Sequence, residues 1–123
     1  MQTKITAITL SILSLMAFST SQAASSLKVT VKGRYSTQST EIFRDMNDWV
    51  CKTEHNPYVP SKTKPYSDAK LKTIATMRPS KKECRDLVII SDLTAKPAKT
   101  YSGCADDMAI KPFLAELNKN CGR

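Results

Sequence analysis

Glu54 and His55 form the one adjacent pair of residues in this chain that could carry out acid–base chemistry, and His55 is the only histidine. A carboxylate, an imidazole and a lysine together can cleave RNA, acting as base, acid and phosphate stabiliser. The sequence has no phosphate-binding loop, nucleophile elbow, zinc-protease motif or calcium-binding loop. A histidine beside a glutamate is a common coincidence. We therefore predict no catalytic residue, no metal and no cofactor, and keep a small cationic nuclease, a secreted effector or toxin, as the alternative function.

A second chemical pattern lies in residues 53–66, where three prolines alternate with lysines and tyrosines. Prolines fix φ and exclude a helix, so we expect a stiff, exposed, basic loop. Aromatic rings beside ammonium groups suit stacking and contacts with anions. The binding residues predicted from this loop and from the lysines after it are Tyr58, Lys62, Lys64, Tyr66, Lys70, Lys72, Lys81 and Lys82. The alternative is a connector whose lysines only keep the protein soluble.

The chain is strongly basic, with 19 Lys and Arg against 11 Asp and Glu. Residues 1–23 contain Lys4 and no acidic residue, so residues 24–123 have 18 basic and 11 acidic side chains and a formal charge of +7. Such a charge raises encounter rates with acidic partners. Without a catalytic pattern, it predicts a non-enzymatic binding domain of the inhibitor, immunity or envelope-accessory type. Its partner would be an acidic protein or another anionic macromolecule.

Residues 1–23 have the organisation of a secretory signal peptide: Lys4, an apolar run over residues 5–18, and small residues before Ala23. The run is shorter than the roughly 20 residues that cross a membrane, and no second apolar run follows it. We therefore expect cleavage after Ala23 and a periplasmic or secreted location. Residues 24–123 then form a single exported domain without a transmembrane segment.

Four cysteines follow the predicted cleavage point: Cys51, Cys84, Cys104 and Cys121. An even number in an oxidising compartment predicts two disulfides. Their spacings of 33, 20 and 17 residues lack the close pairs of zinc sites and redox motifs. Of the three possible pairings, we predict Cys51–Cys84 with Cys104–Cys121, because these bonds close the shorter loops. Cys51–Cys121 with Cys84–Cys104 is the alternative, because it would join two amphipathic helices.

Two apolar patterns near the start of the exported part predict one strand and one helix. In residues 26–33, apolar and polar residues alternate, which is typical of a half-buried strand. In residues 39–52, the apolar residues have helical spacing and form one stripe, with Trp49 as a core residue. The members of this stripe are Ile42, Phe43, Met46, Trp49 and Val50.

The rest of the chain also favours helices. Ser67 can cap a short helix that follows it, and Pro112 and Gly122 are placed to begin and end a terminal one. A capping-box pattern at residues 80–83 favours a helix over residues 84–93, although the run Leu-Val-Ile-Ile is also typical of a buried strand. The composition of residues 94–103 predicts a loop. We therefore predict a mainly α fold, with α+β as the alternative: a small disulfide-stapled domain of about three to four short helices and one N-terminal strand.

Overall fold

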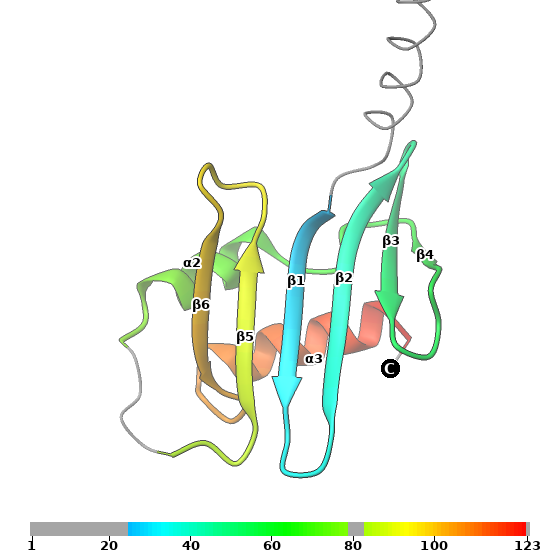
Figure 1. Ribbon diagram of the computed structural model, residues 1–123. Helices are drawn as coiled ribbons and strands as arrows, with labels where there is room; N and C mark the ends of the chain where they lie inside the picture. Colours follow the sequence, from blue (N-terminus) through cyan, green and yellow to red (C-terminus); the bar gives the residue numbers. More distant parts are fainter. Residues whose placement is uncertain (1–24, 79–82, 123) are drawn as a thin grey trace, which may run out of the picture.

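The computed structural model (Figure 1) describes residues 25–78 and 83–122. Within these ranges, six strands form one antiparallel sheet in the order β4-β3-β2-β1-β5-β6. The elements are β1 (Ser25–Lys32), β2 (Thr37–Asp45), β3 (Asp48–Thr53), β4 (Val59–Ser61), α2 (Asp68–Thr76), β5 (Leu87–Asp92), β6 (Lys99–Cys104) and α3 (Ile110–Asn120). The predicted signal peptide with its cleavage point lies outside the described residues, as do Lys81 and Lys82.

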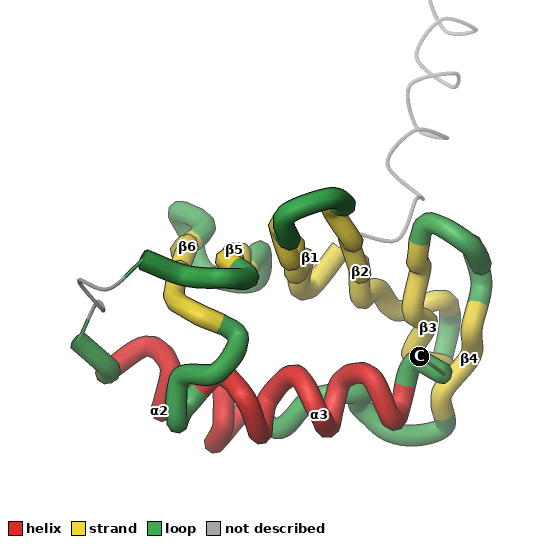
Figure 2. The backbone as a smooth tube through the Cα atoms, turned by 90° about the horizontal axis from the view of Figure 1, so that it is seen from below, coloured by secondary structure: helices red, strands yellow, loops and turns green. Residues whose placement is uncertain are grey.

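Both helices lie on the same face of the sheet (Figure 2). The core fills the space between the two layers, where strand residues that point toward the helices meet the apolar sides of α2 and α3. Its most buried members are Leu27, Val29, Ile42, Val88 and Ile90 from the sheet and Ile74, Ile110, Phe113 and Leu117 from the helices. Neither helix covers the opposite face of the sheet, which we call the open face.

The predicted mainly α fold is wrong, and residues 39–52 are the main reason. This segment forms β2 and β3, joined by a turn at Met46 and Asn47. Ile42 lies opposite Leu27 of β1 on one side and opposite Cys51 of β3 on the other, and all three side chains are buried. The apolar residues fit a helical stripe equally well. The pairing of β2 with both neighbouring strands decides for the sheet, and Met46 stays 91% exposed at the turn.

The predicted helix over residues 84–93 and the predicted loop over residues 94–103 are wrong for a related reason. Leu87–Asp92 forms β5, which pairs with β1 on one edge and with β6 on the other. The capping-box pattern before it starts no helix at Glu83, the described member of the pattern. Residues 99–104, of which 99–103 were predicted as loop, form the edge strand β6. Partners far away in the sequence thus override the local preference for helix or loop.

The predictions for three other elements are confirmed. β1 spans the predicted strand, and α2 follows Ser67, whose side chain accepts a hydrogen bond from the backbone N–H of Lys70. α3 begins at Ile110, with Pro112 in its first turn, and Gly122 follows its end with φ 74°. A glycine in this left-handed conformation is the usual way to end a helix.

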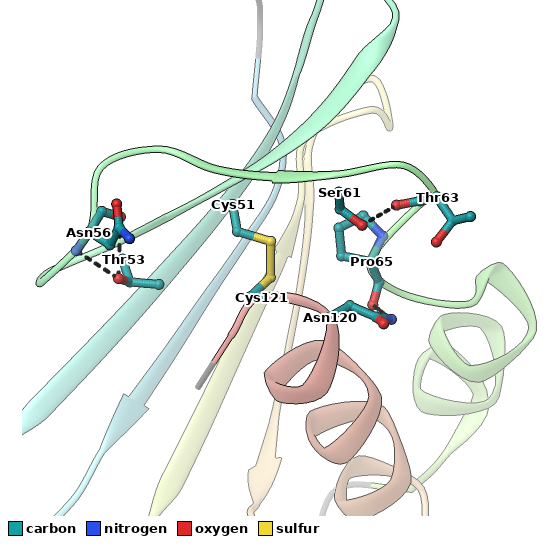
Figure 3. The surroundings of a disulfide bond; sticks show 8 residues. All are labelled: Cys51, Thr53, Asn56, Ser61, Thr63, Pro65, Asn120 and Cys121. Carbon is teal, nitrogen blue, oxygen red and sulfur yellow. Dashed lines mark hydrogen bonds between the residues drawn. A yellow bond between two sulfur atoms is a disulfide. The ribbon is translucent and has the colours of Figure 1, made fainter.

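The structure contains two disulfides, but not those of the favoured pairing. Cys51 is bonded to Cys121, 70 residues away, and Cys84 to Cys104, 20 residues away. The prediction of Cys51–Cys84 with Cys104–Cys121 is therefore wrong, and the alternative pairing is found. It joins β3, rather than a helix, to the end of α3, because α3 crosses the sheet and brings Cys121 to the third strand (Figure 3). Two disulfides are consistent with an extracellular or periplasmic location.

Candidate functional site

Of the predicted binding residues, Tyr66 lies in the core. Its side chain is 4% exposed and packs against Phe113, with ring centroids 6.0 Å apart. Burial, with a smaller contribution from the carboxylates of Asp68 and Asp92, raises the pKa of Tyr66 to about 12. The ring therefore stabilises the fold and is not available to a partner.

Lys64 and Lys70 interact with acidic and aromatic residues of the protein itself. The Nζ of Lys64 lies 2.6 Å from Oδ1 of Asp68, and it also lies over the rings of Tyr66 and Trp49, at 4.8 and 5.5 Å from the centroids. Lys70 Nζ lies 3.4 Å from Oε2 of Glu116, which ties α2 to α3. These two lysines hold the loop and the helices together.

Tyr58, Lys62 and Lys72 are the predicted binding residues that remain exposed. Tyr58 is 48% exposed, and its hydroxyl donates a hydrogen bond to Oδ2 of Asp45 at 2.8 Å. This hydrogen bond to the carboxylate is the main reason that the pKa of Tyr58 is raised. Lys62 and Lys72 form no ion pair with the residues that the structure describes. The loop therefore contributes part of a basic surface rather than a complete site.

The structure gathers the positive charge around α2 and α3. We call residues 59–78 and 110–120, which include both helices, the basic region. It contains two acidic residues, Asp68 and Glu116, and seven basic residues: Lys62, Lys64, Lys70, Lys72, Arg78, Lys111 and Lys119. Residues 25–58 have five basic and four acidic residues, and residues 83–109 have three and five. The basic region thus carries +5 of the formal +7.

Lys111 and Lys119 belong to the basic region but were not among the binding residues predicted from the sequence. Both are exposed on α3, on the side away from the core residues Phe113 and Leu117. The apolar stripe of the terminal helix was recognised, so its outward positions could have been inferred from the same spacing.

The open face of the sheet has a different charge pattern. Lys28 of β1 lies opposite Glu41 of β2, and Glu41 lies opposite Lys52 of β3, so charges of opposite sign alternate across the strands. Ser25 also donates a hydrogen bond to Glu41. This face is therefore electrostatically mixed, unlike the basic region.

Glu54 and His55 lie in the turn that follows β3. Oε2 of Glu54 accepts a hydrogen bond from the backbone N–H of Ser39 at 2.9 Å, which holds the turn against β2. His55 is exposed and lines a hollow of about 540 Å³. No lysine is among the described residues of its lining, so the phosphate-stabilising group that RNA cleavage requires is not placed there.

One group of possible metal ligands occurs among the described residues, at the turn between β6 and α3. It consists of Cys104, Asp106 and Asp107. The sulfur of Cys104 is bonded to Cys84, and Oδ2 of Asp107 accepts a hydrogen bond from the backbone N–H of Cys104 at 2.7 Å. These contacts explain the cluster as a turn that positions the start of α3.

Within the described residues, neither helix is long and apolar enough to cross a membrane. In comparisons with known proteins, the chain matches no family model, no curated protein and no solved structure.

Proposed function

We propose that this chain is an exported, cationic, non-enzymatic binding domain that engages an acidic macromolecular partner in the periplasm or outside the cell. Inhibitor, immunity and envelope-accessory proteins are the types that fit. The observation that carries the proposal is the concentration of charge: the basic region has seven basic and two acidic side chains, and the rest of the described chain is close to neutral or acidic.

Both acidic side chains of the basic region are already engaged. Asp68 pairs with Lys64, and Glu116 pairs with Lys70 and accepts a hydrogen bond from the backbone N–H of Ser67. The cations that remain exposed are Lys62, Lys72, Arg78, Lys111 and Lys119. An anionic partner would therefore meet positive charge without competition from nearby carboxylates, and such a field steers association.

The scaffold under these cations is rigid. Leu71 and Ile74 bury one side of α2, and Ile110, Phe113 and Leu117 bury one side of α3. The Cys51–Cys121 disulfide fixes the end of α3 to the sheet. Little conformational freedom would be lost when a partner binds, which favours affinity.

Charge reversal in two places tests the proposal. The variant K72E/K111E/K119E changes the basic region, and K28E/K32E/K52E makes the same change of net charge on strands β1 and β3. The probe is fluorescently labelled poly-L-glutamate, followed by anisotropy at increasing salt. We expect the wild type to bind with an affinity that falls with salt, the first variant to lose about tenfold or more, and the second to lose much less.

Two results would contradict the proposal. One is equal loss of affinity in both variants, which would show that only net charge matters. The other is the absence of salt-dependent binding of the wild type to polyglutamate, heparin and RNA.

The alternative, a small cationic nuclease, is retained because His55 lines a hollow beside Glu54. We expect no cleavage of single-stranded or double-stranded RNA by the purified protein. Cleavage that is abolished in H55A would replace the binding-domain proposal with this one.

A further inference from the structure

The hollow beside the Cys51–Cys121 disulfide has the size of a small-molecule site. Its volume is about 540 Å³, and ligand pockets span roughly 300–1,000 Å³. We call it the polar hollow. Its lining comes from β2, the end of β3 and the turn after it, β4 and the end of α3, and comprises Gln38, Thr53, His55, Asn56, Val59, Asn118, Cys121 and Gly122.

The lining of the polar hollow is uncharged in an otherwise highly charged protein. None of its described members is Lys, Arg, Asp or Glu, although 24% of the residues in the chain are of these types. The side chains of Gln38, His55 and Asn118 form no hydrogen bond with any residue that the structure describes. Carboxamides and imidazole can both donate and accept hydrogen bonds. Their chemistry fits an uncharged ligand that offers hydroxyl and amide groups.

Local contacts hold one wall of the polar hollow in place. The backbone N–H of Thr53 donates to the carbonyl of Asn56 at 2.9 Å, and the N–H of Asn56 donates to the hydroxyl of Thr53 at 3.1 Å. Figure 3 shows this turn beside the disulfide. Asn56 Oδ1 also accepts a hydrogen bond from the N–H of Tyr58 at 3.3 Å. The turn that carries His55 is therefore fixed before any ligand arrives.

The opposite wall is fixed by the end of α3. Cys121 is bonded to Cys51, and Gly122, with φ 74°, follows the end of the helix. Val59 and the disulfide add apolar surface beside the polar groups. A ligand with apolar C–H faces and polar edges would match this combination, and saccharide rings have both.

We propose that the polar hollow binds a short, uncharged saccharide that carries acetamido groups. The side-chain amides of Gln38 and Asn118 complement the C=O and N–H of an acetamido group, and His55 can pair with a ring hydroxyl. The ligand is uncharged and the site lies outside the basic region apart from Val59 and Asn118, so this binding goes beyond the proposed function.

An NMR titration with N,N′,N″-triacetylchitotriose tests the inference. We expect saturable shifts of the backbone amides of Gln38, Thr53–Asn56 and Asn118–Gly122, with a millimolar dissociation constant that does not change between low and high salt. Cellotriose, which has similar rings without acetamido groups, should bind several-fold more weakly. Binding of the saccharide should not depend on salt, whereas binding of an anionic partner to the basic region should. Either kind of binding can therefore be absent while the other is observed.

Side-chain variants define the site. N118A and Q38A should each weaken binding about fivefold, the effect of one lost hydrogen bond. N47A removes the same carboxamide from the exposed β2–β3 turn and should leave binding unchanged. Q38A changes an exposed residue, so it provides a test even if N118A does not fold.

Three outcomes would overturn the inference: no saturable shift with the wild type, shifts centred on residues outside the polar hollow, or equal weakening by N47A and N118A. Equal affinity for cellotriose would overturn the assignment of the acetamido group.

Discussion

Gly103 of β6 lies where three side chains leave no free space beside the strand. A Cβ atom at this position of β6 would lie 2.6 Å from Cδ1 of Ile110, 2.7 Å from Oδ2 of Asp107 and 2.8 Å from Cε of Met77. A residue without a side chain leaves room for the ends of these three side chains, which would have to move to admit a Cβ atom. The glycine is thus required by packing rather than by backbone conformation.

Replacing Gly103 by alanine should therefore destabilise the protein. The added methyl group overpacks the core edge, and we expect the free energy of unfolding to fall by about 1–3 kcal/mol. Urea denaturation of G103A measures this change. The matched control is S102A, at the exposed neighbouring position, which should change little. Equal stability of the two variants would contradict this prediction, because it would show that the three side chains move aside without cost.

Burial of Tyr66 makes the free energy of unfolding fall as the pH rises above 10. Its pKa rises from the ordinary 10.0 to about 12 in the folded state. Above pH 10 the unfolded chain releases this proton first, so its contribution to stability is complete below pH 10 and is lost as the pH rises toward 12. In the variant Y66F this contribution is missing at every pH.

Between about pH 10 and about pH 12, we expect the free energy of unfolding of the wild type to fall relative to that of Y66F. Urea denaturation of both proteins across this range measures it. All other ionisable groups are the same in the two proteins and cancel in the comparison. A difference that does not change with pH would mean that Tyr66 is not buried as described.

At the scale of elements, the turn between β2 and β3 contains a residue, Met46, whose backbone conformation is unfavourable for its side chain. Met46 has φ 58°, and it is the first of two residues between the paired Asp45 and Asp48. A positive φ at this first position is typical of a type II′ turn, which prefers glycine there. The Met46 side chain is 91% exposed, so it contributes little packing to offset its backbone strain.

The variant M46G should stabilise the protein by about 1 kcal/mol, because glycine adopts positive φ without the steric cost of a Cβ atom. Thermal and urea denaturation measure the gain. N47G, one residue further along, should give no gain, because Asn47 is not in the positive-φ region. Destabilisation by M46G would contradict the described turn.

The two disulfides should contribute unequally to stability. In the chain-entropy model, the 70-residue separation of Cys51 and Cys121 corresponds to about 4 kcal/mol and the 20-residue separation of Cys84 and Cys104 to about 3 kcal/mol. We therefore expect C51A/C121A to lose more stability than C84A/C104A in urea denaturation. Peptide mapping of the non-reduced protein checks the pairing itself, and a peptide that links Cys51 to Cys84 would contradict it.

The sequence predicted those elements whose pattern fits only one structure. The alternation in β1 excludes a helix, and the stripe of α3 excludes a strand. By contrast, Ile42 and Val50 are spaced for either, and the decision came from Leu27 and Cys51 on neighbouring strands. No local pattern contains that information.

For the candidate sites too, residues within one segment could be proposed from the sequence, and residues brought together by folding could not. Lys62 and Lys72 could be proposed from the sequence because they belong to a recognisable basic segment. The polar hollow could not be predicted, because Gln38, His55 and Asn118 come from separate elements that only the folded sheet and α3 bring together.

At the scale of the whole molecule, net charge is distributed unevenly between the basic region and the rest of the described chain. Residues 59–78 and 110–120 carry a net charge of +5, out of the formal net charge of +7. Like charges in one region repel each other, and salt screens this repulsion over about 8 Å at physiological ionic strength. The folded protein should therefore become more stable as sodium chloride is added to a low-salt buffer.

We expect this gain to be at most about 1 kcal/mol, as for other surface charge interactions. K72E/K111E/K119E should lose most of the salt dependence, whereas K28E/K32E/K52E should keep more of it. Thermal denaturation across a salt series measures both. Identical salt curves for the two variants would show that the position of the charges has no effect on stability.

The place of β1 inside the sheet has a consequence for how the protein is made. β1 is the first strand of the chain, but it lies between β2 and β5. While the chain folds, one edge of β1 has no partner until Leu87–Asp92 is present and pairs with it. Unpaired strand edges associate with other chains. A fragment that ends before Leu87 would therefore keep this edge of β1 unpaired and would be prone to aggregate.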